Sequence, residues 1–524
     1  MYRSTLLLFL AASTSSAQIV NRINGAPSDS NRVEDAAPLA NGDVLLGGDM
    51  VNFQDGIQSV ATLTRTGPDG SPIWCTAFDS NEGYDTGVGV RALAGGDAAF
   101  LFYAGTGNNA VTIARTDANG NVLWAKRYPG DYSYPPGGMK VESGENGDSI
   151  IFANRYSSPE AFGGQLLRVG AAGGAVELSK YYFGDENVFQ VYFSDVVVPA
   201  GEDYFVTGGV YHFVPQTEQY KTDLLVARID RAGNVVWSMA YDLAGTEFDV
   251  FEEGRSIALT QQGNVAVLGR TTPQGLREGY DACLQLLIDP ATGALLASNL
   301  VDNVDPAPAS LEQTSSGNLL ASGTRRYGDG QGAAQMWLID PSTMQALWRA
   351  EYDDGQSGAA DAIEPLSPLP RSEANYIVVG AHYTAPETAI GTPDQMFIRT
   401  DSSGNDFCSA NLWIPGPIAT QIAASPFAIT PATVEASKDF DGIWFAYTLD
   451  SRQLCTQNTC PCDLNHDGFV DDADFSFFVV AYDLLLCDDP LMPPGCPADF
   501  NADGFVDDAD FSIFVVAYND LLCP

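Results

Sequence analysis

Two stretches near the C-terminus place oxygen-bearing side chains at alternate positions of a short loop. The segment DLNHDGFVDDAD occupies positions 463–474, and DFNADGFVDDAD repeats it at positions 499–510. A hard cation such as Ca²⁺ takes roughly six to eight oxygen ligands, and side chains at alternate positions of a looping backbone converge on one centre. The spacing therefore predicts two calcium-binding loops, each holding one ion.

Every ligand position of both loops carries an oxygen donor. Gly468 and Gly504 stand at the sixth position, where the sharp turn favours a residue without a side chain. Two acidic turns without an ion are the alternative, but crowded carboxylates repel one another when no cation is present. The expected ligands are Asp463, Asn465, Asp467, the backbone carbonyl of Phe469, Asp471 (directly or through water) and Asp474 in the first loop, and Asp499, Asn501, Asp503, the carbonyl of Phe505, Asp507 and Asp510 in the second.

An apolar pattern at helical spacing follows each loop and predicts helices over residues 474–486 and 510–522. Packing in the core of the small C-terminal unit is the simplest role for these side chains. A docking face for a partner is the alternative, because so small a unit cannot bury both helices fully. The residues concerned are Phe475, Phe478, Val479 and Tyr482 in the first helix and Phe511, Phe514, Val515 and Tyr518 in the second.

The nine cysteines are unevenly distributed, and six of them lie within residues 455–523. Such a density either staples a small domain through disulfides or ligates a metal such as zinc. Zinc sites usually contain C-x-x-C pairs or nearby histidines, which this spacing does not supply. Disulfides are therefore expected, and they persist in an oxidising, extracytoplasmic environment.

The composition of the whole chain restricts its partners. The 524 residues include 67 Asp and Glu against 25 Lys and Arg, for a formal net charge of -42. A nucleic-acid binder needs clustered cations to neutralise phosphates, so the charge argues against nucleic acid as a partner and disfavours an anionic membrane surface. A hydrophobic content of 45% is sufficient for a packed core, so we expect a globular protein.

The N-terminus has the features of a secretory signal. Residues 1–17 contain Arg3, the apolar run LLLFLAA and a small-residue cleavage site ending at Ala17. The run is shorter than the ~20 residues that a membrane-spanning helix needs, and no later segment reaches that length. A buried N-terminal strand is the alternative. We expect an exported protein, secreted or at the cell surface, without a membrane span.

One phrase recurs through the long remainder of the chain: an apolar strand, a D-x-x-G-type turn, and a second strand that often carries Trp. The spacing between turn glycines ranges from 50 residues (Gly70 to Gly120) to 60 (Gly233 to Gly293). Glycine supplies the positive φ that a tight hairpin requires, and the turn aspartates should hydrogen-bond their own turns. The seven copies are RTGPDGSPIW, RTDANGNVLW, RVGAAGGAVEL, RIDRAGNVVW, LIDPATGALLA, LIDPSTMQALW, in which Met344 replaces the glycine, and RTDSSGNDFC.

A second hairpin signal precedes most copies, as in LANGDVLLGGD around Gly42. Each unit therefore contains about four short strands, and such units at this period predict an all-β fold, a β-propeller, over residues 18–455. The Trp positions indicate packing between blades, with a carbohydrate-stacking platform as the alternative. Eight blades are favoured over seven, because residues 426–450 resemble further blade strands and residues 18–24 resemble a fourth strand that would close the ring.

Both parts resemble known families. The NG-D and D-x-x-G-N-x-x-W phrases resemble secreted bacterial propeller repeats. Residues 456–524 resemble a dockerin domain, and more closely its Cys-flanked variety, through the calcium loops and the entry Cys496-Pro497-Ala498-Asp499. The resemblance implies binding to a cohesin-like module or a cell-envelope receptor. The chain departs from cellulosomal dockerins by carrying Asp472-Ala473 and Asp508-Ala509 where a Ser/Thr pair often contacts the cohesin.

The repeat also indicates a disulfide pattern. Cys460 and Cys487 bracket the first copy as Cys496 and Cys523 bracket the second. Pairing within each copy, Cys460–Cys487 and Cys496–Cys523, is therefore expected, with Cys455–Cys462 as a third bond. Each bond would stabilise the unit by restricting its unfolded chain.

Few residues point to catalysis. Only His212 and His382 lie in the repeat region, and no nucleophile elbow, zinc-protease or phosphate-loop motif occurs. The sequence favours a non-catalytic propeller that serves as a binding or scaffold protein and is attached through the calcium module. A polysaccharide is a further candidate ligand. The alternative is an extracellular enzyme, polysaccharide-degrading or quinoprotein redox, with the same anchoring module.

Overall fold

The computed structural model describes the strands and most tight turns of residues 19–456, with gaps at the longer connections. In the C-terminal region it describes two helices and parts of the loops before them, between residues 462 and 520. The chain divides into two compact units, Met1–Cys455 and Thr456–Pro524. The predicted signal at residues 1–17 lies outside the described residues.

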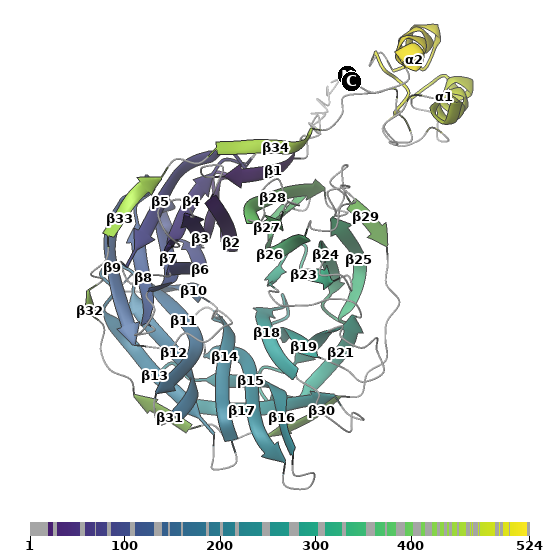
Figure 1. Ribbon diagram of the computed structural model, residues 1–524. Helices are drawn as coiled ribbons and strands as arrows, with labels where there is room; N and C mark the ends of the chain where they lie inside the picture. The colour runs from purple at the N-terminus through teal and green to yellow at the C-terminus, as the bar shows by residue number, and fades with distance from the viewer. Residues whose placement is uncertain are drawn as a thin grey trace, which may run out of the picture. The chain divides into compact units, whose positions relative to one another are not determined.

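The first unit is a ring of antiparallel sheets, a β-propeller (Figure 1). The described strands form six sheets, and within five of them consecutive strands pair in chain order. A short 3-10 turn, η1 (Ala94–Gly96), lies between β6 and β7. The bounds in the first three sheets are β2 (Asp29–Pro38), β3 (Val44–Asn52), β4 (Gln58–Thr66), β5 (Pro72–Asp79) and β33 (Ile443–Tyr447); β6 (Asp85–Ala92), β7 (Ala98–Ala104), β8 (Ala110–Thr116), β9 (Val122–Pro129) and β32 (Lys438–Asp439); β10 (Met139–Gly144), β11 (Gly147–Ser158), β12 (Ala161–Gly170), β13 (Val176–Phe183) and β31 (Thr430–Thr433).

The remaining sheets continue around the ring. The last of them has ten strands in two antiparallel groups, which are linked by the parallel pair Gly332 and Ala362. The bounds are β14 (Val188–Val197), β15 (Tyr204–Val214), β16 (Gln219–Ile229), β17 (Val235–Leu243) and β30 (Ile422–Pro426); β18 (Glu252–Leu259), β19 (Val265–Thr271), β20 (Ala282–Ile288) and β21 (Leu295–Val301); then β22 (Leu311–Gln313), β23 (Leu319–Arg326), β24 (Gly332–Asp340), β25 (Gln345–Tyr352) and β29 (Ala410–Trp413), with β26 (Ala362–Ser372), β27 (Asn375–Tyr383), β28 (Pro393–Asp401), β1 (Ile19–Asn24) and β34 (Asp450–Thr456).

The six sheets correct the expected blade count of eight, and also the alternative of seven separate sheets. Two sequence repeats share the ten-stranded sheet, because a parallel bridge joins their strand groups. The N-terminal strand does close the ring as expected: β1 pairs antiparallel with β28, with Val20 opposite Ile398. Its hydrogen-bonded neighbours, however, are β28 and β34 (Asp450–Thr456), and not the strands β30–β33 that lie between residues 422 and 447.

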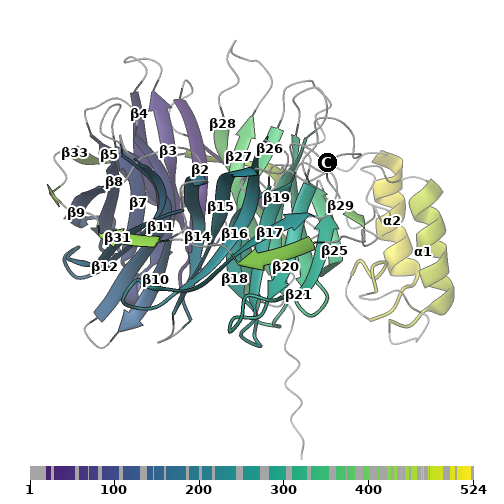
Figure 2. The same cartoon turned by 90° about the horizontal axis from the view of Figure 1, so that it is seen from below.

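Strands near residues 426–450 form no blade of their own, which is the reason that the eight-blade expectation fails. The outer strands β29–β34 instead add one after another to sheets already formed, as on the rim in Figures 1 and 2. For example, Ala424 of β30 lies opposite Tyr241 of β17, and Ala432 of β31 lies opposite Tyr181 of β13. Each added strand covers hydrogen-bonding groups that an edge strand would otherwise expose.

The recurring Trp packs between sheets. The indole Nε1 of Trp74 donates to the carbonyl of Ala118 in the next repeat at 3.1 Å, and Trp124 donates to Ala171 at 3.0 Å. A Cβ on Gly120, whose φ is 82°, would lie 2.8 Å from the ring of Trp74. The turn glycine thus serves both the positive φ and the close approach of the preceding blade's indole. The interpretation of these positions as blade-to-blade packing is confirmed.

Polar residues of the repeat phrase tie the two hairpins of one blade together. Arg115 pairs with Asp97 of the preceding turn at 2.6 Å and also donates to the carbonyl of Ala171 in the next sheet. Arg65 and Asp43 form the same pair in the first sheet. Arg228 likewise bonds Asp203 and the carbonyl of Pro290, so the Arg of these copies is a connector both within and between blades, whereas Leu287 and Leu338 take this position in two other copies.

The turn aspartates hydrogen-bond their own turns, as predicted. Asp117 accepts from the backbone amides of Asn119 and Asn121, each at 2.9 Å, and Asp230 does the same for Ala232 and Asn234. Met344 takes the glycine position of its turn with a φ of 56°, and its side chain is buried. Met344 thus adopts a backbone conformation that usually favours glycine, and its thioether side chain is buried.

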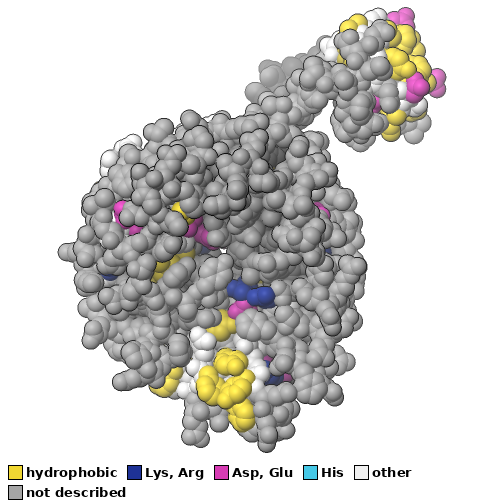
Figure 3. Space-filling view, viewed as in Figure 1, with side chains coloured by type: hydrophobic (Ala, Val, Ile, Leu, Met, Phe, Trp, Pro, Cys, Tyr) yellow, Lys and Arg dark blue, Asp and Glu magenta, His cyan; other side chains and the backbone are white. Residues whose placement is uncertain are grey.

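The second unit contains two helices, α1 (Asp472–Leu484) and α2 (Asp508–Asp520). The Tyr482 hydroxyl donates to Asp508 and the Tyr518 hydroxyl donates to Asp472, each at 2.5 Å, so the C-terminal part of each helix meets the start of the other. The helices are therefore antiparallel. Hydrophobic side chains also reach the surface of this unit (Figure 3). No helix among the described residues is both long and apolar enough to cross a membrane.

Candidate metal-binding module

The last predicted ligand of each loop is a buried carboxylate that the loop backbone surrounds. Asp510 accepts from the amides of Phe500 at 2.8 Å and Asn501 at 3.2 Å, and its other oxygen accepts from the amide of Asp507 at 3.0 Å. Both Asp474 and Asp510 are 0% exposed. A carboxylate at the end of the loop thereby folds the rest of the loop back over the start of the helix.

The first loop repeats this contact. Asp474 accepts from the amide of Leu464 at 2.7 Å, which is the counterpart, ten residues earlier, of the bond from Phe500 to Asp510. Sequence identity between the copies thus extends to the same local hydrogen bond. The other predicted ligands of the first loop, and one of the second, lie outside the described residues: Asp463, Asn465, Asp467, Phe469, Asp471 and Asp503.

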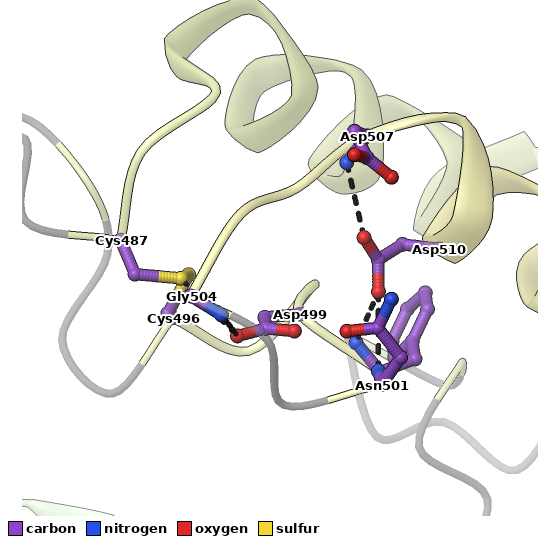
Figure 4. The surroundings of a disulfide bond; sticks show 8 residues. Cys487, Cys496, Asp499, Asn501, Gly504, Asp507 and Asp510 are labelled. Atoms are coloured by element: carbon purple, nitrogen blue, oxygen red, sulfur yellow. Dashed lines mark hydrogen bonds between the residues drawn. A yellow bond between two sulfur atoms is a disulfide. The ribbon is translucent and has the colours of Figure 1, made fainter.

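The start of the second loop also has a turn suited to a cation. Asp499, the first predicted ligand, accepts from the amide of Gly504 at 2.9 Å, and Gly504 has a φ of 89° (Figure 4). Val506, two residues later, is fully buried. The residue without a side chain and the buried anchor are thus placed as the calcium-loop pattern predicts.

The donor types of the second loop are those that calcium prefers. The described ligands supply the carboxylates of Asp499, Asp507 and Asp510, the side-chain amide of Asn501 and the carbonyl of Phe505, and a hard cation prefers such oxygens. Among the described residues, the three carboxylates do not lie within 4.8 Å of one another, since each is bonded to backbone amides. Calcium would have to draw Asp499 and Asp507 inward toward Asp510.

The disulfide among the described residues of this unit differs from both pairings expected within the copies. Cys487 is bonded to Cys496, with the Cα atoms 5.3 Å apart (Figure 4). Because the helices are antiparallel, the second loop begins beside the end of α1, where Cys487 lies. An α-helix rises ~1.5 Å per residue, so α1 itself separates Cys487 from the loop that precedes it. Antiparallel packing therefore brings Cys487 closer to the start of the second copy than to the start of its own copy.

The third expected bond, Cys455–Cys462, is also wrong. Cys462 is a free thiol that is 1% exposed, and burial raises its pKa to about 11. It packs in the core of the unit beside Val470 and Phe478. A thiol with a raised pKa is mostly protonated at neutral pH and behaves there as a small apolar side chain. Cys460 and Cys523 lie outside the described residues.

The helices divide their apolar residues between a core and an exposed surface. Phe478 and Phe514 are each 1% exposed, and their ring centroids lie 5.2 Å apart. Phe475 and Val479, which have the same helical spacing, are 40% and 44% exposed. Their counterparts on α2, Phe511 and Val515, are exposed to a similar degree. Packing in the core therefore accounts for Phe478 and Phe514, but it does not account for the exposed residues at the same helical spacing.

Exposed apolar residues occupy equivalent positions of the two helices. Phe477 is 57% exposed and Val480 is 58% exposed on α1, while Ile513 and Val516 take the same places on α2. Exposed contiguous apolar surface of this kind commonly marks a binding site. The unit therefore offers two similar apolar faces, one on each helix. We name Phe477 and Val480 the α1 face, and Ile513 and Val516 the α2 face.

The contacts between Tyr and Asp were not anticipated from the sequence. Asp508 accepts from Tyr482, and this bond raises the pKa of the Tyr482 hydroxyl above its ordinary value. Asp472 and Asp508 are two of the positions at which the sequence departs from the dockerin pattern that it resembles. The identical spacing of Asp and Tyr in the two copies was the feature of the sequence that could have indicated these contacts. Only the antiparallel packing shows that each copy contacts the other.

His212, the propeller histidine whose side chain the structure describes, lies in a polar network. His212 Nε2 lies 2.8 Å from a carboxylate oxygen of Asp223. Lys221 Nζ lies 3.0 Å from the other oxygen of Asp223 and 2.7 Å from Asp242. The prediction that His212 is a satisfied structural residue agrees with this network. The side chain of His382 lies outside the described residues.

Comparisons with known proteins give matches to solved structures only. No protein-family model and no curated protein matches it. A protein of unknown function from Dyadobacter fermentans DSM 18053 is 13% identical over 76% of this chain and 98% of that chain, with a TM-score of 0.37. MPT-4, a mannose phosphorylase from Leishmania mexicana, is 8% identical over 58% of this chain and 79% of that chain, with a TM-score of 0.23.

Proposed function

We propose that this protein is an exported, non-catalytic β-propeller that serves as a binding or scaffold protein. Its C-terminal unit would attach it to a cell-surface or extracellular partner when calcium is present. Export rests on the signal-like residues 1–17. The attachment rests on residues 456–524, which combine two calcium-type loops with two exposed apolar helix faces.

The observation that carries this proposal is the equivalent placing of Asp474 and Asp510. Each is a fully buried carboxylate that receives a backbone amide from ten residues earlier. Burial of a carboxylate away from water is costly even where backbone amides bond it, and a cation would compensate its charge. Two such positions in one small unit support two calcium ions.

Calcium, when bound, would hold the loop oxygens around one centre and fix the start of each helix. The chain's own residues already prepare this arrangement. Asp510 holds the loop backbone through three amides, and the bond from Gly504 to Asp499 sets the turn. Ordering of the loops would steady the helices that present the apolar faces. A cohesin-like module or a cell-envelope receptor with a complementary apolar surface is the proposed partner.

Titration of calcium into the full-length protein, followed by calorimetry, tests the metal sites. We expect two bound ions in the unaltered chain and one in Asp474→Asn or Asp510→Asn, because each substitution removes one buried charge. Asp483→Asn is the matched control, since Asp483 is an exposed residue of α1 outside the loops. Absence of binding heat, together with helicity that EDTA leaves unchanged, contradicts the proposal.

Capture of exported proteins by the full-length chain tests the attachment. We expect a partner to be retained with calcium, released by EDTA, and retained less by the double variant Phe477→Ser/Val516→Ser. The matched control is Leu123→Ser, which alters an exposed apolar residue of the propeller. Equal retention by the double variant and the control would show that the helix faces are not the docking surface.

A further inference from the structure

The chain that leaves α1 forms a short β-bridge with the second calcium-type loop. Leu485 follows the last residue of α1 with a φ of 65°, a left-handed conformation that commonly ends a helix. Leu486 then pairs antiparallel with Phe505, whose backbone carbonyl is one of the predicted ligands. Residues 485–487 therefore connect the first sequence copy to the calcium loop of the second, and we name them the α1 extension.

Two hydrogen bonds beside this bridge determine the direction of the Phe505 carbonyl. The Cys487 amide donates to the carbonyl of Gly504 at 3.2 Å, and the Val506 amide donates to the carbonyl of Leu485 at 2.9 Å. Peptide groups alternate in direction along a strand of such an antiparallel pair, so the carbonyl of Phe505 faces away from the α1 extension. A backbone ligand cannot turn without its chain. The α1 extension thus sets the direction of this ligand.

The disulfide lies beside a second predicted ligand of the same loop, Asp499. Cys487 Sγ is 3.5 Å from the carboxylate oxygen of Asp499 that accepts from the Gly504 amide. The amide of Asp499 itself donates to the carbonyl of Cys496 at 3.1 Å. In Figure 4 the disulfide lies on the side of Asp499 opposite to Asp510. A disulfide sulfur donates no hydrogen bond, so this contact limits movement of the carboxylate away from the other ligand.

The charge of the loop gives a reason for such support. Asp499, Asp507 and Asp510 carry like charges within one short loop, and residues 453–524 contain no Lys or Arg. Carboxylates brought close together repel one another, and a loop that can relax separates them. Restraint of the loop before the ion arrives reduces the ordering that binding must supply.

We propose that the α1 extension and the disulfide between Cys487 and Cys496 position the Phe505 carbonyl and the Asp499 carboxylate for calcium in the second loop. The calcium affinity of that loop then depends on the end of the first copy's helix. The first loop precedes α1, whose 13 residues place its two ends roughly 20 Å apart, so this disulfide has little effect there. The inference rests on the proposed function, because it names the residues that prepare one of the two proposed calcium sites.

Calorimetric titration of calcium into four full-length variants tests the inference. Asp474→Asn leaves the second loop intact and Asp510→Asn leaves the first, and each is prepared with and without Cys487→Ser/Cys496→Ser. Loss of the disulfide should raise the dissociation constant of the second loop at least about tenfold, and that of the first loop less than about threefold. Cys487→Pro/Cys496→Ser also removes the amide donor to Gly504 and should weaken the second loop by a further factor of about five.

Val479→Gly is the matched control for a general loss of stability. It places glycine at an exposed position inside α1, which destabilises the helix without altering the α1 extension or the disulfide. Its effect on calcium affinity should be similar at the two loops. Hydrogen–deuterium exchange in EDTA adds a readout without calcium: the peptide that contains the Gly504 and Val506 amides should exchange faster in Cys487→Ser/Cys496→Ser than in the control.

Selective weakening of the second loop supports the inference. Equal weakening of both loops, or an unchanged second loop, overturns it while calcium binding itself persists. Absence of binding heat in the unaltered chain contradicts the proposed function, and the inference is lost with it. The titrations of the unaltered chain and of the four variants therefore distinguish the two failures.

Discussion

At the scale of single residues, the repeat phrase is a set of contacts between neighbouring blades. The indoles of Trp74, Trp124 and Trp237 each donate to a backbone carbonyl of the next repeat. Tyr128, Tyr182 and Tyr241, on the strands that follow three of the turns, do likewise, and Tyr128 for example donates to the carbonyl of Gly174 at 2.8 Å. The turn that carries the glycine thus reverses the chain and also provides backbone carbonyls that accept hydrogen bonds from the preceding blade.

Replacement of Trp124 by Phe should weaken this contact while keeping most of the ring. The carbonyl of Ala171 would lose the indole donor, and a net hydrogen bond contributes about 1 kcal/mol to stability. We expect the free energy of unfolding of the propeller to fall by about that amount in urea titrations. Leu123→Ala, at the exposed neighbour, should change it by less than ~0.5 kcal/mol. Equal effects of the two substitutions would contradict the role of the indole.

The turn aspartates should contribute to acid sensitivity. The pKa of the Asp117 carboxyl lies below its ordinary value because it accepts hydrogen bonds from the side chain and backbone of Asn121 and from the backbone of Asn119. A lowered folded-state pKa gives stability that is present above the unfolded-state pKa and is lost as pH falls through the folded-state pKa. Calorimetry from about pH 6 to pH 2 should show a shallower acid decline of the melting temperature in Asp117→Asn. Parallel curves for variant and parent would exclude this role.

At the scale of elements, strands remote in sequence complete sheets that local hairpins begin. The hairpins of each blade follow from turns between adjacent strands. β1 and the outer strands β29–β34 pair instead with strands far away in the chain. Such pairings close edges and tie the ring together, and no local turn signal accompanies them.

The pairing of β30 with β17 can be tested by removing its backbone donors. Successive amides of a strand point to opposite sides, so the double variant Ala423→Pro/Ala424→Pro removes whichever amide faces β17. We expect faster amide exchange in residues 235–243, measured by hydrogen–deuterium exchange with mass spectrometry. Residues 176–183, which pair with β31, should keep their exchange rates. Unchanged exchange in both segments would show that β30 contributes nothing to the sheet.

At the scale of the whole molecule, the chain consists of two compact units with different sources of stability. The propeller has cores between consecutive sheets, such as the cluster around Ile151, Phe193 and Val206. The C-terminal unit has one small core around Phe478 and Phe514, together with the disulfide. Small cores usually need such additional links.

Removal of that disulfide should therefore affect only one unit. Closing a loop of this length should contribute about 2.5 kcal/mol in the chain-entropy account. In Cys487→Ser/Cys496→Ser we expect a lower melting temperature for α1 and α2 by far-UV circular dichroism, with the propeller transition unchanged. Non-reducing peptide mapping of the unaltered chain should recover the bond between Cys487 and Cys496. Recovery of a bond from Cys460 to Cys487 instead would contradict the structure.

The sequence alone was sufficient for features that depend on local chemistry. The calcium-type loops, the turn aspartates and the interblade role of Trp were predicted because side-chain type and spacing determine a turn or a helix within a few residues. The described residues confirm the turn and Trp contacts, and the calcium ions stay a prediction. Repetition also predicted a propeller, since each unit has an exposed apolar sheet face that a neighbour must cover.

The tertiary structure decided the features that depend on which distant segments meet. The six sheets, the outer strands from residues 410–456, the bond from Cys487 to Cys496 and the contacts between Tyr482 and Asp508 all join parts that the sequence pattern treats as separate. The same holds for the ring contacts among Phe189, Tyr211 and Tyr220, which come from three strands. Pairing across long sequence separations depends on the packing of whole elements, and a periodic pattern describes each element without specifying its partner.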